Sequence, residues 1–251
     1  MSGDADVNRI LVVDDDVIMG ELLSALMIAE GYGVTQAGSG AECLRLIREN
    51  EKPNVILFDM HMPGMHGGEL AEALQTARTN GDLPARTVLL AMSGSIPETE
   101  ATDFFDGFLR KPFTTAEFAE AVRSARAGLP SATAGQQPMH PEPMQAPALD
   151  DRIFEQLRSK IETESLRQLY DMTLDDVRAR LSRIATAAGS GDQSTVRREA
   201  HTIKGSCGMV GALELQALAA ATEGGSPVDT SALADFDSAC QRLQRMLDER
   251  L

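Results

Sequence analysis

A proline-rich stretch near the middle of the chain limits what the rest of it can fold into. Residues 129–148 read LPSATAGQQPMHPEPMQAPA and hold five of the 11 prolines in this 251-residue chain. The stretch keeps no hydrophobic period, and its Pro/Ala/Gln composition is typical of a semi-rigid linker that is partly polyproline II. The sequence therefore predicts two domains, residues 1–128 and 149–251, joined by this linker.

Short apolar runs alternate with amphipathic stretches in residues 1–128. The uninterrupted apolar runs within Arg9–Val13, after its first residue, and over Val55–Phe58 are typical of buried parallel strands. The remaining pattern predicts strands over Val34–Ala37, Thr87–Ala91 and Gly107–Leu109, and helices over Val17–Ala29, Ala41–Glu49, Gly68–Arg78 and from Thr114 or Thr115 onward. This alternation predicts an α/β fold with a doubly wound, five-stranded parallel sheet.

The second domain carries no strand signal. Apolar residues recur there at intervals of three and four, as in Leu166, Tyr170, Leu174 and Val177. That spacing predicts an all-α bundle of four main helices preceded by a short one.

Polar side chains follow four of the five predicted strands, where each strand ends. They are Asp14 and Asp15 after the first strand, Asp59 after the third, Ser93 after the fourth and Lys111 after the fifth. Ligands of doubly wound sheets bind at this edge, and clustered carboxylates suit a hard cation such as Mg²⁺. A hydroxyl and an ammonium nearby could hold phosphoryl oxygens, so the set suits phosphoryl transfer to a carboxylate.

The motifs around these residues resemble the receiver domain of two-component response regulators. They read ILVVDDD, VILFDMHMPGMHGGEL, LLAMSGS and FLRKPF, and the resemblance covers about residues 7–127. It implies a flavodoxin-like fold with Asp59 as the phosphoacceptor. It further implies Mg²⁺ or Mn²⁺ bound by Asp14, Asp15, Asp59 and the backbone carbonyl of His61, phosphoryl contacts from Ser93 and Lys111, and a switch aromatic at Phe108.

One segment departs from the receiver pattern. Only 17 residues, 94–110, separate Ser93 from Lys111. The fourth helix of the family would have to fit there, so we expect it to be short, distorted or missing. We expect the stretch from Ile96 to Asp106 to be the most mobile or irregular part of the first domain.

A different class of protein shares part of the first motif. VVDDDV also comes close to the DxDxV motif of haloacid-dehalogenase-like phosphatases, with Asp14 as the nucleophile, Asp16 as the acid and Ile18 where the motif has valine. Such an enzyme needs an acidic pair shortly after the lysine, and KPFTTAEFAEAVRSA contains none. We expect Asp16 instead to cap the helix that follows it.

His201 is the one histidine of the second domain. At about 100° per residue it points away from the apolar stripe of its helix, which contains Val196, Ile203 and Cys207. Helical geometry therefore predicts a solvent-exposed imidazole, near the cation Lys204. A neutral imidazole is an adequate nucleophile near pH 7.

The segment AHTIKGSCGMVGA resembles the signature of histidine phosphotransfer (HPt) domains, over about residues 150–250. The resemblance implies that His201 carries a phosphoryl group and that Lys204 steadies it. Gly205 and Gly208 would clear space for a docked receiver. Glycines inside a helix cost roughly 1 kcal/mol each relative to alanine, which favours a functional reason for them.

Net charge and hydropathy limit the classes of binding partner and the cellular compartment that we expect. The net charge of -15 argues against unaided binding to nucleic acid or to anionic membranes. The apolar runs are too short to span a bilayer, and the polar N-terminus shows no signal core, so we expect a cytoplasmic protein. Three widely spaced cysteines form no metal-binding motif and are expected to be buried.

Together these features predict a phosphorelay protein rather than an enzyme with its own ATP site. A sensor histidine kinase would supply a phosphoryl group to Asp59. His201 would exchange a phosphoryl group with a receiver, either this one or another protein's. In the alternative, phosphorylation of the receiver gates access to His201 and no phosphoryl group passes between the two. The linker is long enough for the two domains of one chain to reach each other. The direction of flow, the cognate kinase and receiver, the stimulus and the oligomeric state stay open.

Overall fold

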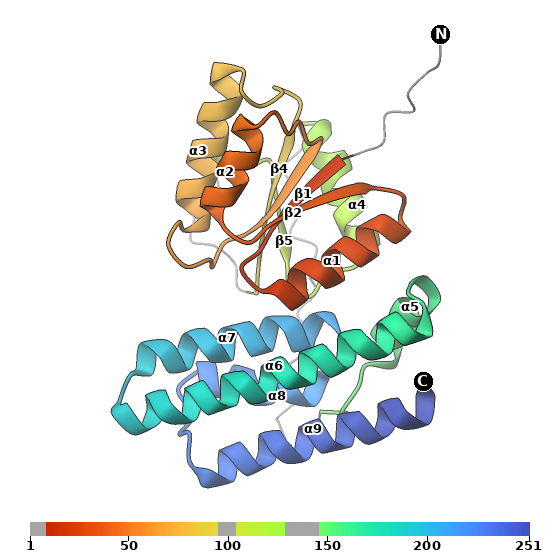
Figure 1. Ribbon diagram of the computed structural model, residues 1–251, viewed down its shortest axis with the longest axis vertical. Helices are drawn as coiled ribbons and strands as arrows, with labels where there is room; N and C mark the ends of the chain where they lie inside the picture. The colour runs from red at the N-terminus through yellow and green to blue at the C-terminus, as the bar shows by residue number, and fades with distance from the viewer. Residues whose placement is uncertain (1–8, 95–103, 129–145) are drawn as a thin grey trace. The chain divides into compact units, whose positions relative to one another are not determined.

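The computed structural model describes residues 9–94, 104–128 and 146–251 (Figure 1). The chain divides into two compact units, residues 1–136 and 137–251. Most of the predicted linker, residues 129–145, lies outside the described residues. The exact domain limits therefore stay a prediction.

The first unit is built on a five-stranded, wholly parallel sheet. Its strands are β1 (Arg9–Val13), β2 (Gly33–Ala37), β3 (Val55–Asp59), β4 (Val88–Ser93) and β5 (Gly107–Arg110), and its helices are α1 (Val17–Ala29), α2 (Gly40–Arg48), α3 (Gly67–Asn80) and α4 (Thr115–Arg126). The strand order β2-β1-β3-β4-β5 reverses direction between β1 and β3, as in doubly wound sheets. The predicted α/β fold is confirmed.

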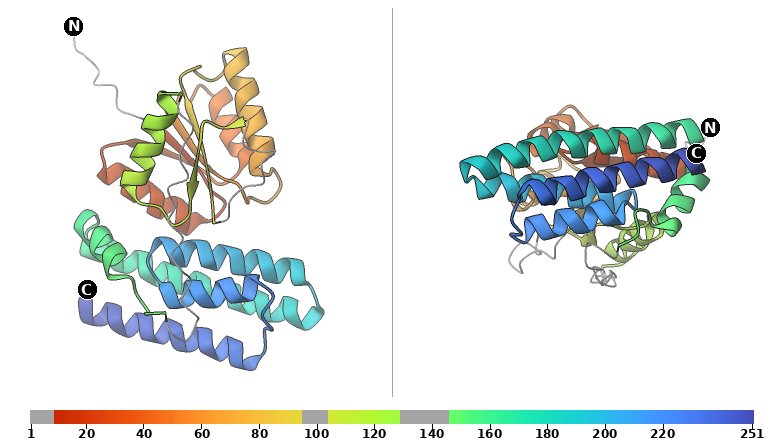
Figure 2. Two further views of the ribbon diagram at one scale, coloured as in Figure 1. Left: turned by 180° about the vertical axis from the view of Figure 1, so that it is seen from behind. Right: turned by 90° about the horizontal axis from the view of Figure 1, so that it is seen from below.

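Helices cover both faces of this sheet. In the two opposite views, α1 and α4 lie on one face, and α2 and α3 lie on the other (Figures 1 and 2). Every residue of the central strands β3 and β4 is buried, which explains their unbroken apolar sequence. A sheet covered in this way leaves its strand ends as the place where polar groups can gather.

Local signals set where the flanking helices begin. The Asp16 carboxylate accepts hydrogen bonds from the amides of Ile18 and Met19, so it caps α1 as the sequence predicts. Thr114 and Glu117 form a capping box at the start of α4, which agrees with the predicted start of this helix. Asp14 and Asp15 are thereby held between the end of β1 and the start of α1.

The segment between β4 and β5 is described only in part. Residues 95–103, which hold most of the stretch where a distorted fourth helix was expected, lie outside the described residues. The described end of the segment is anchored, because the Asp106 carboxylate accepts hydrogen bonds from Nη1 and Nη2 of Arg78 and from the backbone amide of Leu89. β5 therefore starts from a fixed point beside α3 and β4.

The second unit is an all-α bundle of four main helices with a short one before them, as predicted. These are α5 (Asp151–Lys160), α6 (Thr163–Ser190), α7 (Gln193–Met209), α8 (Leu213–Glu223) and α9 (Thr230–Arg250). The Tyr170 side chain of α6 is fully buried, and its hydroxyl donates to the carbonyl of Val210 at the end of α7. That bond joins α6 to the turn after the helix that carries His201.

The three cysteines, Cys43, Cys207 and Cys240, are buried and unbridged, as the sequence predicts. No helix within the described ranges is long and apolar enough to cross a membrane.

Candidate functional site

Strand ends bring four polar side chains together at one edge of the sheet in the first unit. Asp14 follows β1, Asp59 ends β3, Ser93 ends β4 and Lys111 follows β5. All four residues are buried, with at most 9% of their surface exposed. The edge therefore holds a compact polar pocket on an apolar core, in the place the sequence predicts.

Lys111 joins the two buried carboxylates of this pocket. Its Nζ lies 2.9 Å from an oxygen of Asp14 and 2.9 Å from an oxygen of Asp59. The other Asp59 oxygen, Oδ1, accepts from the backbone amide of His61 at 3.0 Å. The Asp59 carboxylate is thus fixed from two sides.

The two carboxylates differ in their ease of protonation. Burial, followed by the neighbouring charge of Asp59, raises the pKa of Asp14 to about 7, although Lys111 opposes that rise. Burial would also raise the pKa of Asp59, but the Lys111 ammonium and the His61 amide outweigh it and lower that pKa. Asp59 is therefore the carboxylate held ionised at neutral pH, as a nucleophile must be.

The residues present fit a hard divalent cation. Asp14, Asp15 and Asp59 each offer a carboxylate oxygen, and these oxygens lie within 4.8 Å of one another. Asp15 is the exposed member of the three. Only Lys111 forms an ion pair with this group among the described residues, and one ammonium cannot balance three carboxylates. An oxygen set with excess negative charge suits Mg²⁺ or Mn²⁺.

Two other predicted receiver residues lie beside the pocket. Phe108, expected to be a switch aromatic, is buried in β5 opposite Ala91 of β4. His61, expected to act through its backbone carbonyl, also makes a side-chain contact: its Nδ1 lies 3.1 Å from the Ser93 hydroxyl oxygen. No pattern in the sequence indicated this contact, because it depends on the rotamer of one loop side chain.

His201 of α7 lies beside a carboxylate that the sequence did not single out. Its Nδ1 is 2.6 Å from Oε1 of Glu223, the last residue of α8. The other Glu223 oxygen accepts from the Lys204 ammonium. Glu223 therefore bridges the two residues that the sequence assigned to the phosphohistidine site.

The charge state of Glu223 fixes which histidine nitrogen carries hydrogen. Burial would raise the pKa of Glu223, but the hydrogen bonds from His201 and Lys204 lower it to about 2. An ionised carboxylate can only accept, so Nδ1 of His201 must be the donor. In the neutral imidazole the lone pair is then on Nε2, which is the nitrogen with the character of a nucleophile.

His201 was predicted to be solvent-exposed, but its side chain is only partly exposed. The imidazole keeps 22% of its exposure, because the end of α8 lies against it. Gly205 has the open surroundings expected of a docking position, since no described atom beyond its chain neighbours and the adjacent backbone of α7 lies within 4 Å of a Cβ built there. Gly208, the second predicted docking glycine, is buried.

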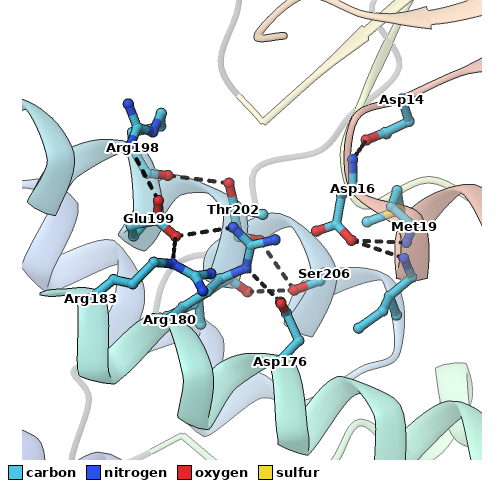
Figure 3. A network of polar contacts seen from close by, with 12 residues as sticks. Asp14, Asp16, Met19, Asp176, Arg180, Arg183, Arg198, Glu199, Thr202 and Ser206 are labelled. Atoms are coloured by element: carbon cyan, nitrogen blue, oxygen red, sulfur yellow. Dashed lines mark hydrogen bonds and ion pairs between the residues drawn. The ribbon is translucent and has the colours of Figure 1, made fainter. Parts of the chain in front are cut away.

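A buried ion cluster holds the first half of α7 against α6. Glu199, with only 6% of its surface exposed, accepts from Arg180 and Arg183 of α6 and from its neighbour Arg198 (Figure 3). Burial opposes ionisation of Glu199, but the guanidinium groups outweigh it and lower its pKa. This cluster lies two residues before His201 and sets the position of its helix turn.

Comparisons with known proteins agree with the division into two units. The response regulator receiver domain model matches residues 10–123, and the Hpt domain model matches residues 168–250. "Sensor histidine kinase AruS" of Pseudomonas aeruginosa is 28% identical over 213 residues, which is 83% of this chain and 20% of that protein. "DNA-binding response regulator MtrA" of Mycobacterium tuberculosis is 31% identical over 117 residues, which is 46% of this chain and 49% of that protein.

The chain spans about half the length of the response regulators that it matches. Among solved structures, the Vibrio cholerae chemotaxis protein CheY4 is 24% identical over 47% of this chain and 98% of that one, with a TM-score of 0.42.

Proposed function

The chain contains a response regulator receiver domain and an Hpt domain, and from this we propose that it relays phosphoryl groups between aspartate and histidine. Two-component phosphorelay signalling follows from the domain pair. Asp59 is the acceptor of the receiver and His201 the carrier of the Hpt domain. The observation that supports this function best is the Asp59 carboxylate held between the Lys111 ammonium and the amide of His61.

Transfer to Asp59 proceeds by substitution at phosphorus. A carboxylate oxygen of Asp59 attacks the phosphorus of a donor phosphohistidine, the new O–P bond forms as the P–N bond breaks, and the electron pair leaves with the imidazole nitrogen. Lys111 and the Ser93 hydroxyl contact the equatorial phosphoryl oxygens, where negative charge accumulates. A divalent cation bound at Asp14, Asp15 and Asp59 would offset the charge on the same oxygens.

His201 acts through the opposite substitution. Its Nε2 attacks the phosphorus of an aspartyl phosphate, a P–N bond forms, and the aspartate carboxylate leaves with the electron pair of the P–O bond. Glu223 accepts the Nδ1–H throughout, so it stabilises the positive charge that develops on the ring. Lys204, three residues after His201 on α7, would leave Glu223 to steady the new phosphoryl group.

A sensor histidine kinase is the class of donor that we propose for Asp59, and a receiver is the partner of His201. The match to a sensor histidine kinase over 83% of this chain supports such a partnership, because it extends across both domains.

Labelling with a phosphodonor tests these assignments. Acetyl phosphate with Mg²⁺ should label the wild type with a base-labile, hydroxylamine-sensitive phosphate, and Asp59→Ala should stay unlabelled. A phosphorylated partner receiver should give acid-labile, base-stable label on the wild type and none on His201→Ala. Label that survives Asp59→Ala and maps to Asp14 would instead favour the phosphatase-like alternative.

The same proteins distinguish relay from gating. If the chain relays internally, label from acetyl phosphate should pass from Asp59 to His201, and the acid-labile form should be missing in Asp59→Ala. If the receiver only gates access to His201, no label should pass from Asp59 to His201 in the wild type. Asp59→Ala should then change the rate at which an external phosphorylated receiver labels His201.

A further inference from the structure

Arg197 is an exposed cation of α7 that no step described so far uses. At about 100° per residue, Arg197 and Lys204 lie about 40° and 60° from His201 around the helix, both on the same side of it. Residues four apart on a helix are neighbours, with about 5 to 6 Å between their Cβ atoms. The Cα–Cβ bonds of a helix also tilt towards its N-terminus, so the His201 side chain leans towards the turn that carries Arg197.

The other cations on this face of α7 already have acidic partners. The Lys204 ammonium donates to Glu223. Arg198 lies 3.4 Å from the carboxylate of Glu199, which also accepts from two arginines of α6 (Figure 3). Arg197 forms no hydrogen bond or ion pair with any residue that the structure describes. Its charge and its donors are therefore available to a ligand.

A phosphoryl group on His201 would bring more negative charge than the bridge from Glu223 balances. Such a group carries about two negative charges near pH 7. Burial would raise the pKa of Glu223, but its hydrogen bonds to His201 and Lys204 lower it to about 2, so the charge of Glu223 cancels that of Lys204. The added group therefore calls for a further cation. A guanidinium suits it, because its fork of N–H donors matches phosphoryl oxygens.

We propose that Arg197 is a phosphoryl-binding residue, whose guanidinium donates to the phosphoryl oxygens of phosphorylated His201. Arg197 makes and breaks no bond of the transferred group and contributes only charge and hydrogen bonds. The proposal rests on the proposed function, since it takes His201 as the carrier. It adds to that function a cation that Glu223 does not share.

The exchange equilibrium between two variants of this chain tests the proposal. His201→Ala, loaded on Asp59 with acetyl phosphate and Mg²⁺, is mixed with Asp59→Ala, and the base-labile and base-stable labels at equilibrium are compared. Adding Arg197→Gln to the acceptor should shift their ratio about five-fold towards Asp59, the equivalent of about 1 kcal/mol for an exposed charged contact. Arg245→Gln, which removes an exposed arginine of α9 instead, is the matched control and should leave the ratio unchanged.

The same measurement separates phosphoryl binding from contact with a docked receiver. A residue that touches only the receiver acts while the two proteins are bound, so it changes the forward and reverse rates equally and leaves the equilibrium between the separate proteins unchanged. Slower transfer in both directions with an unchanged ratio would overturn the proposal. Thermal unfolding checks each variant, and glutamine has nearly the helix propensity of arginine, so α7 should stay intact.

Phosphorus spectra give a readout that needs no receiver. Asp59→Ala labelled on His201 with phosphoramidate should give a ³¹P signal that titrates at higher pH once Arg197→Gln is added, because a nearby cation favours the doubly charged phosphoryl group. If Asp59→Ala with Arg197 intact takes no label on His201 from either donor, the proposed function of His201 fails. If it takes label and Arg197→Gln changes neither the ratio nor the titration, only the role of Arg197 fails.

Discussion

Replacing Glu223 with glutamine should remove an acid-sensitive part of the stability of the Hpt unit. Glu223 keeps a pKa of about 2 in the folded chain against an ordinary value of 4.5. A carboxylate whose pKa is lowered by folding contributes stability that is complete above its unfolded pKa and is lost as pH falls through the folded one. The Glu223 contribution should therefore be full above pH 4.5 and should disappear towards pH 2.

The size of this contribution follows from the same two values. At about 1.4 kcal/mol per pKa unit, the gap between 4.5 and about 2 corresponds to about 3 kcal/mol. The Glu223 side chain retains 27% of its exposure, so water screens its pairs with His201 and Lys204. We therefore expect about 1 to 2 kcal/mol in measurement.

Urea unfolding of the full chain at several pH values between 7 and 2 tests this. The ring signals of labelled Tyr170 report on the Hpt unit alone, which matters because the receiver has acid-sensitive carboxylates of its own. Glu223→Gln should be less stable than wild type at pH 7 and should converge with it near pH 2. Glu214→Gln is the control, because it makes the same change on α8 at an ion pair with Arg242. This variant retains Glu223, so it should still lose the stability that Glu223 contributes as the pH falls. Parallel curves for wild type and Glu223→Gln would show that His201 and Lys204 do not hold Glu223.

Three further substitutions test other features. Tyr170→Phe should destabilise the Hpt unit by about 1 to 3 kcal/mol in urea unfolding, because it leaves a buried carbonyl at the end of α7 without its donor. Gly67→Ala should destabilise the receiver by about 1 to 3 kcal/mol, because the added Cβ would lie 2.5 Å from the Met60 Cα; unchanged thermal unfolding would contradict this. Gly205→Leu should stabilise α7 by up to about 1 kcal/mol and yet slow transfer from a receiver, whereas Gly189→Leu, equally open on α6, should not slow transfer. Equal transfer rates would show that Gly205 does not clear space for a partner.

The sequence predicted the pocket of the first unit well because topology brings its parts together. Asp14, Asp59, Ser93 and Lys111 each lie at the end of a strand, and parallel strands end at one edge. Periodicity alone was therefore enough to place them near one another. The capping role of Asp16 followed in the same way from its position before a helix.

Contacts that depend on which helices are neighbours could not be predicted. Glu223 lies 22 residues from His201 on a different helix, and the period of α7 says only which side of α7 is apolar. It does not say that α8 ends against the polar side, so the imidazole was expected to be more exposed than it is. The contact between His61 and Ser93 was missed for a related reason, since loop rotamers leave no periodic signal.

The bridge from Glu223 to His201 and Lys204 bears on how firmly the Hpt domain could hold its cargo. A phosphoryl group on Nε2 of His201 would have to draw Lys204 away from Glu223 to be neutralised by that ammonium. This competition for Lys204 would raise the free energy of the phosphorylated form relative to a histidine with an unshared lysine. Such a site would have a higher group-transfer potential and would favour handing its phosphoryl group on over storing it.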